Sequence, residues 1–137
     1  MKISPYLHFD GRCDEAIEFY KKALGAELQF MVRFKENPEP QYNPPGMDEK
    51  IMHANLLIGE TQIMVSDGRC MGDAKFEGIT LSIEAADAAE ADRLFNALAE
   101  GGKVIMPQSQ TFFSPRFGMV ADKFGVHWMV IVPQPMS

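Results

Sequence analysis

The feature that most constrains the fold of this chain is an apolar helical pattern that occurs twice. Both helical segments run out into glycine, a residue that commonly ends helices. The first copy contains Ala16, Phe19 and Tyr20, and the second, 75 positions later at each residue, contains Ala91, Leu94 and Phe95. The repetition predicts a chain built from two copies of one structural unit.

The first copy has the pattern of a strand, a helix and three further strands. Residues 3–10 alternate like a strand, and residues 12–24 carry one apolar stripe at helical spacing, with charges opposite. A second strand is expected over 27–35, and a hairpin over 51–59 and 61–67. An amphipathic helix beside such strands predicts a sheet that is covered on one face, with the other face turned toward something else.

The second copy repeats this order. Asp87 and Glu90 have the spacing of a capping box at the start of its helix. Its strands are expected over 79–84, 103–106, 116–120 and 127–132, the last two joined by a turn at 122–125. We therefore expect an α+β fold of two βαβββ modules in one domain over 1–137, with repeat 1 at about 1–68 and repeat 2 at about 77–134.

Each copy also contains a long loop at the corresponding place. Residues 36–49 include Pro38, Pro40 and the pair Pro44–Pro45, so neither a helix nor a sheet ladder is expected there. The second loop is expected over 107–115. A loop of this length in a compact domain is usually a lid or a binding loop, so the two loops are expected to border a site.

Composition and charge exclude several classes of partner. The net charge of -6, with no stripe of Lys or Arg, argues against nucleic acid. No segment has the ~20 apolar residues of a membrane span, and Pro5, His8 and Asp10 interrupt any signal peptide, so a soluble cytoplasmic protein is expected. Two cysteines do not form a disulfide framework, so Cys13 and Cys70 are expected to be thiols, with Cys13 in the core.

A family resemblance rests on four segments that together span nearly the whole chain. They are PYLHFDGRCDEAIEFY, KIMHANLLIG, ITLSIEAADAAEADRLFNALAEGGKVIMP and RFGMVADKFGVHWMV. As a set, they resemble the PhnB-like branch of the glyoxalase / bleomycin-resistance / extradiol-dioxygenase (vicinal oxygen chelate) superfamily. The resemblance implies curved mixed sheets around a cleft, commonly in a homodimer. In metal-bearing members it implies four inward His, Glu or Gln ligands, two from each module.

The metal ligands of that superfamily do not carry over to this chain. Their four positions fall at Pro5, Met64, Gly78 and Met129. Proline and glycine have no ligating side chain, and a thioether is a soft ligand that suits copper(I) rather than zinc, nickel or manganese. We therefore expect no metal and no cofactor at the usual site. The family also bears a demethylubiquinone methyltransferase name, which we discount because the chain lacks the glycine-rich turn and doubly wound fold that normally hold S-adenosylmethionine.

Strand alternation extends the face that these four positions mark into a candidate ligand-binding cleft. A mixed apolar and polar lining of this kind orients small ligands. The expected lining residues are Leu7, Phe9, His53, Asn55, Gln62, Ser66, Thr80, Ser82 and His127. His8 has the opposite parity and is expected to pack under the helix. Arg116 is expected either to hold a carboxylate or phosphonate in the cleft or to pair with Asp122 across the last hairpin.

These observations favour a homodimeric small-molecule binding protein of the bleomycin-resistance type, which sequesters its ligand and lacks the usual metal quartet. The alternative is a metal-dependent lyase, isomerase or dioxygenase with a displaced metal site that uses His53, His127 and an unforeseen carboxylate. One of the two histidines could instead act as a general base. A third possibility is an interaction module whose cleft is filled by its own loop, 37–48. The sequence does not identify the ligand or any reaction, nor whether the cleft forms within one chain or between two.

Overall fold

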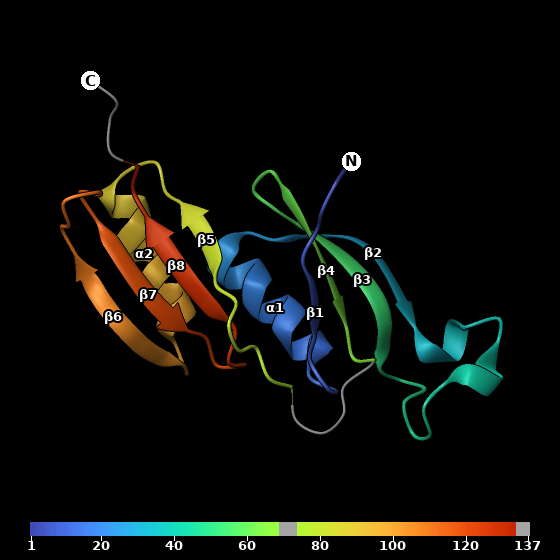
Figure 1. The fold of residues 1–137 in the computed structure, drawn as a ribbon. Coiled ribbons are helices and arrows are strands. Elements are labelled where there is room, and N and C mark those ends of the chain that lie inside the picture. Colours follow the sequence, from blue (N-terminus) through green and yellow to red (C-terminus); the bar gives the residue numbers. More distant parts are fainter. Residues whose placement is uncertain (69–73, 134–137) are drawn as a thin grey trace. The chain divides into compact units, whose positions relative to one another are not determined.

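The computed structural model describes residues 1–68 and 74–133, so Cys70 lies outside the described residues. The chain forms two compact units, Met1–Ala74 and Lys75–Ser137. Figure 1 shows that each unit contains one helix beside one sheet. In the part of the chain that is described, no helix has the length and apolar character needed to cross a membrane.

The sheet of the first unit is four-stranded and mixed. Its strand order is β1-β4-β3-β2, in which β1 and β4 are parallel and the other neighbours are antiparallel. The elements are β1 (Tyr6–His8), α1 (Cys13–Leu24), β2 (Glu27–Arg33), β3 (Ile51–Ile58) and β4 (Thr61–Ser66). The expected order of strand, helix and three strands is therefore confirmed, although β1 is shorter than the alternation indicated.

Helix α1 follows from local sequence signals. Asp14 and Glu15 lie in its first turn and Lys21 and Lys22 in its last, so that each charge opposes the helix dipole. Gly25 adopts a left-handed conformation with φ of 68° and donates its N–H to the Lys21 carbonyl, which closes the last turn. The buried stripe against the sheet consists of Cys13, Ala16, Ile17, Tyr20 and Ala23.

The second unit repeats this architecture, with strand order β5-β8-β7-β6 and a parallel β5–β8 pair. Asp87 caps α2 by accepting a hydrogen bond from the Glu90 N–H at 2.8 Å. The Glu90 carboxylate in turn accepts a hydrogen bond from the Ala86 N–H, one residue before the position expected for a capping box. The elements are β5 (Leu81–Glu84), α2 (Ala88–Ala99), β6 (Lys103–Ser109), β7 (Phe117–Ala121) and β8 (His127–Ile131).

The internal repeat is reproduced in the packing of both helices. Ala16 and Ala91 are each 0% exposed, and the aromatic residues four positions later, Tyr20 and Phe95, are buried against their own sheets. A small residue at the first of these positions lets the helix approach the strands closely. Together, the two mixed sheets and two helices confirm the α+β class and the βαβββ repeat.

Both proline-rich loops were partly mispredicted. In the first, Pro40–Tyr42 forms a one-turn 3-10 helix, because proline is tolerated at the first helical position; a second such turn spans Phe34–Glu36. In the second, β6 continues through Pro107 to Ser109. It can do so because β6 is an edge strand, where a missing N–H need not break a ladder.

Candidate functional site: the open-face pocket of the first unit

The register of β1 decides which side chains face away from α1. Tyr6 is aligned with Met64 and His8 with Ser66, which places Tyr6 and His8 on the face of the sheet opposite the helix. Leu7 and Phe9 lie on the helix side and are 8% and 2% exposed, and the Phe9 ring lies 6.3 Å from that of Tyr20. The expectation that Leu7 and Phe9 line a cleft while His8 packs under the helix was therefore wrong.

A bulge in β3 brings two consecutive side chains to this open face. Val32 is aligned with His53 and Arg33 with Ile51, so β3 has one extra residue, Met52, opposite β2. Ile51 returns to the core at 0% exposure, while Met52 and His53 both line the same hollow. Strict alternation from Ala54 would place Met52 on the core face, and the bulge turns it to the open face instead.

The hollow on the open face has a volume of about 590 Å³. We call it the open-face pocket. Strands β1, β3 and β4 supply its floor, and the loop between β2 and β3, together with Gly68 after β4, supplies the remainder. The described lining residues include several aromatic rings and no Asp, Glu, Lys or Arg. They are Tyr6, His8, Phe34, Tyr42, Pro44, Met52, His53, Ser66 and Gly68.

A hydrogen-bonded chain crosses the pocket floor. The Nε2 of His53 lies 2.8 Å from the Asn55 side-chain carbonyl oxygen, and its Nδ1 lies 2.7 Å from the Tyr6 hydroxyl. Because a carbonyl oxygen only accepts, a neutral His53 donates from Nε2 and accepts from the Tyr6 O–H at Nδ1. Both ring nitrogens of His53 are thus engaged, and Asn55 acts by fixing the orientation of the ring.

His8 adds a second, separately fixed ring. Its Nδ1 lies 2.9 Å from the Gly68 carbonyl oxygen and therefore carries the proton. Its ring stacks on Tyr6 with centroids 4.7 Å apart and planes 12° apart. The two residues are two positions apart in one strand, so their side chains lie on the same face and can stack.

Two other expected site residues on the first sheet have structural contacts. Ser66 lines the pocket, but its hydroxyl donates to the Met52 carbonyl at 2.7 Å and accepts from the Gly68 N–H at 2.8 Å. Gln62 is not among the described lining residues. Its side chain accepts a hydrogen bond from Lys2 at 3.0 Å and donates one to Gln29 at 3.3 Å. Ser66 therefore shapes the wall, and Gln62 belongs to a polar cluster at the start of β4.

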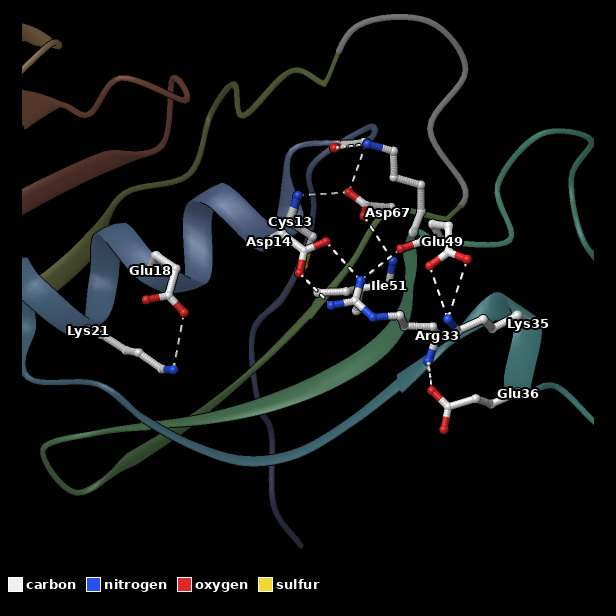
Figure 2. Close-up of polar contacts among 12 residues, drawn as sticks. Cys13, Asp14, Glu18, Lys21, Arg33, Lys35, Glu36, Glu49, Ile51 and Asp67 are labelled. Atoms are coloured by element: carbon white, nitrogen blue, oxygen red, sulfur yellow. Dashed lines mark hydrogen bonds and ion pairs between the residues drawn. The ribbon is translucent and has the colours of Figure 1, made fainter.

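The loop that borders the pocket is anchored at its base, as Figure 2 shows. Arg33 makes a bidentate ion pair with Asp14 of α1 at 2.8 and 2.9 Å, and it donates to the Glu49 carbonyl at 2.7 Å. Lys35 reaches the Glu49 carboxylate at 3.1 Å. The Arg33 guanidinium lowers the pKa of the Asp14 carboxyl, and the same contact raises the pKa of Arg33.

Asp67 holds in place the end of β4, whose neighbouring residues Ser66 and Gly68 line the pocket. Its carboxylate is 2% exposed and accepts from the backbone N–H groups of Gly11, Cys13 and Ile51 at 2.8, 2.9 and 3.1 Å (Figure 2). It therefore ties the turn before α1 to the start of β3. Cys13 is 0% exposed, which confirms it as a core residue. Burial, together with the nearby Asp67 charge, raises the pKa of its thiol.

The remaining expected site residues belong to the second unit, and they do not all share one face there. Ser82 and His127 lie on the face of the β5–β8 sheet that also carries Met129, and Thr80 lies exposed before β5. Arg116 leaves this face, because its Nε donates to Asp92 of α2 at 2.8 Å.

The predicted pair of Arg116 with Asp122 was therefore wrong. The Asp122 carboxylate instead accepts from the N–H groups of Phe124 and Val126 and from the Trp128 indole at 2.9 Å. These bonds hold the turn between β7 and β8 where the sequence predicted it.

The donor set at the expected metal positions does not fit a hard divalent cation. Pro5 and Gly78 offer only backbone, and Met64 and Met129 offer only thioethers. Pro5 also falls on the helix-facing parity of β1, so Tyr6 occupies the neighbouring open-face position. Among the described residues, no three His, Cys, Asp or Glu side chains form a group that could hold a metal ion.

Comparison with known proteins assigns the family. A family model described as 3-demethylubiquinone-9 3-methyltransferase matches residues 1–131. The chain belongs to this family. Protein YjdN of Escherichia coli (strain K12) is 41% identical, over 96% of this chain and 95% of its own length.

Solved structures agree with this PhnB-like family. Protein PA1353 from Pseudomonas aeruginosa is 43% identical with a TM-score of 0.86, over 98% of this chain and 99% of that one. The PhnB protein from Bacillus cereus is 27% identical with a TM-score of 0.81, over 96% and 99%. The fosfomycin resistance protein FosX from Mesorhizobium loti, at 10% identity and a TM-score of 0.65 over 98% and 92%, shares the fold alone, which is that of the vicinal oxygen chelate superfamily.

Proposed function

We propose that this protein binds a small molecule in the open-face pocket and sequesters it without chemical change. The observation that carries the proposal is a hollow of about 590 Å³ lined by aromatic side chains, with polar atoms fixed by the Tyr6–His53–Asn55 chain. A concave apolar surface with a few oriented polar groups is the usual form of a ligand site. The first loop borders the hollow and leaves it open, which argues against a cleft filled by its own loop.

Two observations favour binding over catalysis. Both ring nitrogens of His53 are already committed, so the ring would have to give up a hydrogen bond before it could bind a metal or accept a proton. Methyl transfer is not part of the proposal. S-adenosylmethionine is normally held by a glycine-rich turn in a doubly wound sheet, whereas both sheets here are mixed and four-stranded with one parallel pair each.

The test is a melting-temperature screen of the chain against a library of aromatic small molecules, because a ligand that binds the folded state raises the midpoint. Hits are titrated by calorimetry against His53→Ala and the matched variant His127→Ala, which removes a histidine from the other sheet. Loss of binding in His53→Ala alone supports the proposal. A hit that is unaffected by His53→Ala places the site elsewhere, and a product that differs from the added ligand refutes sequestration.

The alternative function, a metal-dependent lyase, isomerase or dioxygenase that uses His53 and His127, makes a different prediction. Protein purified without a polyhistidine tag would then contain zinc, nickel, manganese or iron at about one ion per chain. Both His53→Ala and His127→Ala would lower that content. Under the binding proposal, neither substitution changes the metal content.

We also propose that the chain forms a homodimer. The edge strands β2 and β6 carry exposed apolar side chains, among them Phe30 at 54% and Val104 at 44%. Exposed apolar edges invite pairing with another chain unless they are covered. Size-exclusion chromatography with light scattering should give twice the mass of 15.3 kDa, and Phe30→Lys with Val104→Lys should restore the monomer. A wild-type monomer at micromolar concentration would refute the dimer.

A further inference from the structure

The directions of the hydrogen bonds in the open-face pocket indicate the class of ligand it accepts. We propose that the pocket selects flat aromatic molecules that carry an N–H or O–H donor, and that it rejects ring carboxylates. This inference rests on the proposed binding function. It depends on which polar atoms of the pocket remain available once its internal hydrogen bonds are made.

The first available atom belongs to His8. The Gly68 carbonyl can only accept, so the 2.9 Å contact fixes the proton of His8 on Nδ1. Nε2 of the same ring then holds a lone pair, and it has no hydrogen-bond partner within residues 1–68 and 74–133. A neutral His8 therefore offers an acceptor.

The second available atom is the hydroxyl oxygen of Tyr6. The Asn55 carbonyl oxygen places the proton of His53 on Nε2, so Nδ1 accepts and the Tyr6 proton points toward it at 2.7 Å. With its only proton committed, the Tyr6 oxygen can only accept from a ligand. Two carbonyl oxygens thus determine, through two histidines, that the floor of the pocket presents acceptors.

The other polar groups do not change this character. The Ser66 hydroxyl proton is given to the Met52 carbonyl, and the Gly68 N–H is given to Ser66. The Tyr42 hydroxyl can still donate, but this residue is 74% exposed and belongs to the loop. The described lining contains no cationic side chain that would pair with a carboxylate.

The shape of the ligand follows from the lining. The rings of Tyr6 and His8 stack with nearly parallel planes, and Phe34 and Tyr42 add further rings to the lining. Ring faces pack well against flat aromatic molecules and carry partial negative charge, so they also favour a ligand with a polar N–H or a cationic edge.

Three probes that share one ring system test the inference: 2-naphthol, which donates, 2-methoxynaphthalene, which only accepts, and 2-naphthoate, which is an anion. Each is titrated into the full chain and followed by ¹H–¹⁵N NMR, with the Gly68 amide as a pocket reporter. One hydrogen bond corresponds to about fivefold in affinity. We expect 2-naphthol to bind about five times more tightly than 2-methoxynaphthalene, and 2-naphthoate to bind most weakly.

Two matched variants locate the effect. His8→Phe keeps a ring but removes the Nε2 acceptor, and it should reduce the preference for 2-naphthol over 2-methoxynaphthalene, leaving only the part that the Tyr6 oxygen supplies. Tyr42→Phe removes the exposed donor and should leave the preference for 2-naphthol unchanged. The melting temperature and circular dichroism of each variant verify that it is folded; if His8→Phe does not fold, the preference of the wild-type chain decides the matter.

The outcomes separate this inference from the function on which it rests. If 2-naphthoate or 2-methoxynaphthalene binds as tightly as 2-naphthol, the selection for donors is wrong while the binding function stands. If 2-naphthol keeps its full preference in a folded His8→Phe chain, His8 is not an acceptor for the ligand and the inference fails. If none of the probes shifts the Gly68 amide while a molecule from the melting-temperature screen binds, this inference fails and the binding function stands; if the screen also finds no ligand, both fall.

Discussion

Replacing Asp67 tests whether one buried carboxylate holds the first unit together. It is 2% exposed and accepts from the N–H groups of Gly11, Cys13 and Ile51. Hydrogen bonds to a charged group contribute about 1.5–3 kcal/mol each, and a lost acceptor leaves buried donors unsatisfied. Because the three bonds share a single carboxylate, we expect Asp67→Ala to lower the free energy of unfolding by about 3–5 kcal/mol in total.

Asp67→Asn distinguishes the contributions of the two carboxylate oxygens, because it replaces only one of them. The remaining oxygen can still accept from Gly11 and Cys13, while the new amide group faces the Ile51 N–H, donor against donor. We expect a smaller loss of about 2–3 kcal/mol. Because Ser66 and Gly68 flank this residue and line the pocket, the Asn variant should also bind pocket ligands more weakly.

Urea denaturation followed by circular dichroism measures these losses. Glu18→Ala is the control, since it removes an exposed carboxylate whose pair with Lys21 at 3.2 Å is worth about 0.2–0.5 kcal/mol. If Asp67→Ala costs less than about 1 kcal/mol, or no more than Glu18→Ala, the carboxylate does not fasten the unit and the reasoning from its three bonds is refuted.

Three further predictions follow from individual contacts. The pKa of Asp14 is lowered chiefly by its hydrogen bond with Arg33. Its stabilisation is therefore present above the unfolded-state pKa of about 3.9 and is lost as the pH falls through the lower folded value. In urea denaturation, the difference between wild type and Asp14→Asn should be full at pH 7 and shrink as the pH falls below about 3.9; a difference that does not change with pH would contradict this. Burial raises the pKa of the Cys13 thiol, so this thiol should react slowly with iodoacetamide. Peptide mass spectrometry at pH 7 should find its alkylation at least about a hundredfold slower in the native chain than in urea. Comparable rates would show that the thiol is accessible. A Cβ on Gly118 would lie 2.7 Å from the Phe95 ring, so Gly118→Ala should cost about 1–3 kcal/mol in urea denaturation and Phe95→Leu should recover part of that loss; no recovery in the double variant would assign the cost to another contact.

The elements that the sequence predicted well are those with local signals. The apolar stripe of α1 and the N-cap at Asp87 depend on residues within one or two helical turns, and so does the turn at 122–125. The repeat of Ala16 at Ala91 then extended these local signals to the whole topology. Each of these features was found where the sequence placed it, apart from shifts of a few residues at the strand ends.

The features that the sequence missed depend on partners distant in the chain. β1 has only three residues, and large side chains lie on both of its faces, so alternation alone could not decide between Leu7 and His8; packing against α1 does. The bulge at Met52 exists only relative to β2. Arg116 pairs with Asp92 because α2 packs on the sheet of the second unit, and no local sequence pattern indicates that pairing.

The roles of Tyr42 and Pro44 were foreseen only as a property of their loop. Proline density marked residues 36–49 as a binding segment, but which of its side chains reach the pocket depends on the 3-10 turn at Pro40–Tyr42. His53 and Asn55 were identified as neighbours on one strand face. Their partner Tyr6 was missed because it lies on the same strand face as His8, and the sequence had assigned that face to the helix side.

The anchoring of the first loop at its base has a consequence for how this family could diversify. The Arg33–Asp14 pair and the Lys35 N–H bond to the Asp48 carbonyl secure the loop below its tip. Substitutions or insertions between residues 39 and 47 would therefore alter the loop side of the open-face pocket without loosening the sheet. Under the proposed binding function, this segment of about nine residues is a natural target for laboratory evolution of ligand specificity.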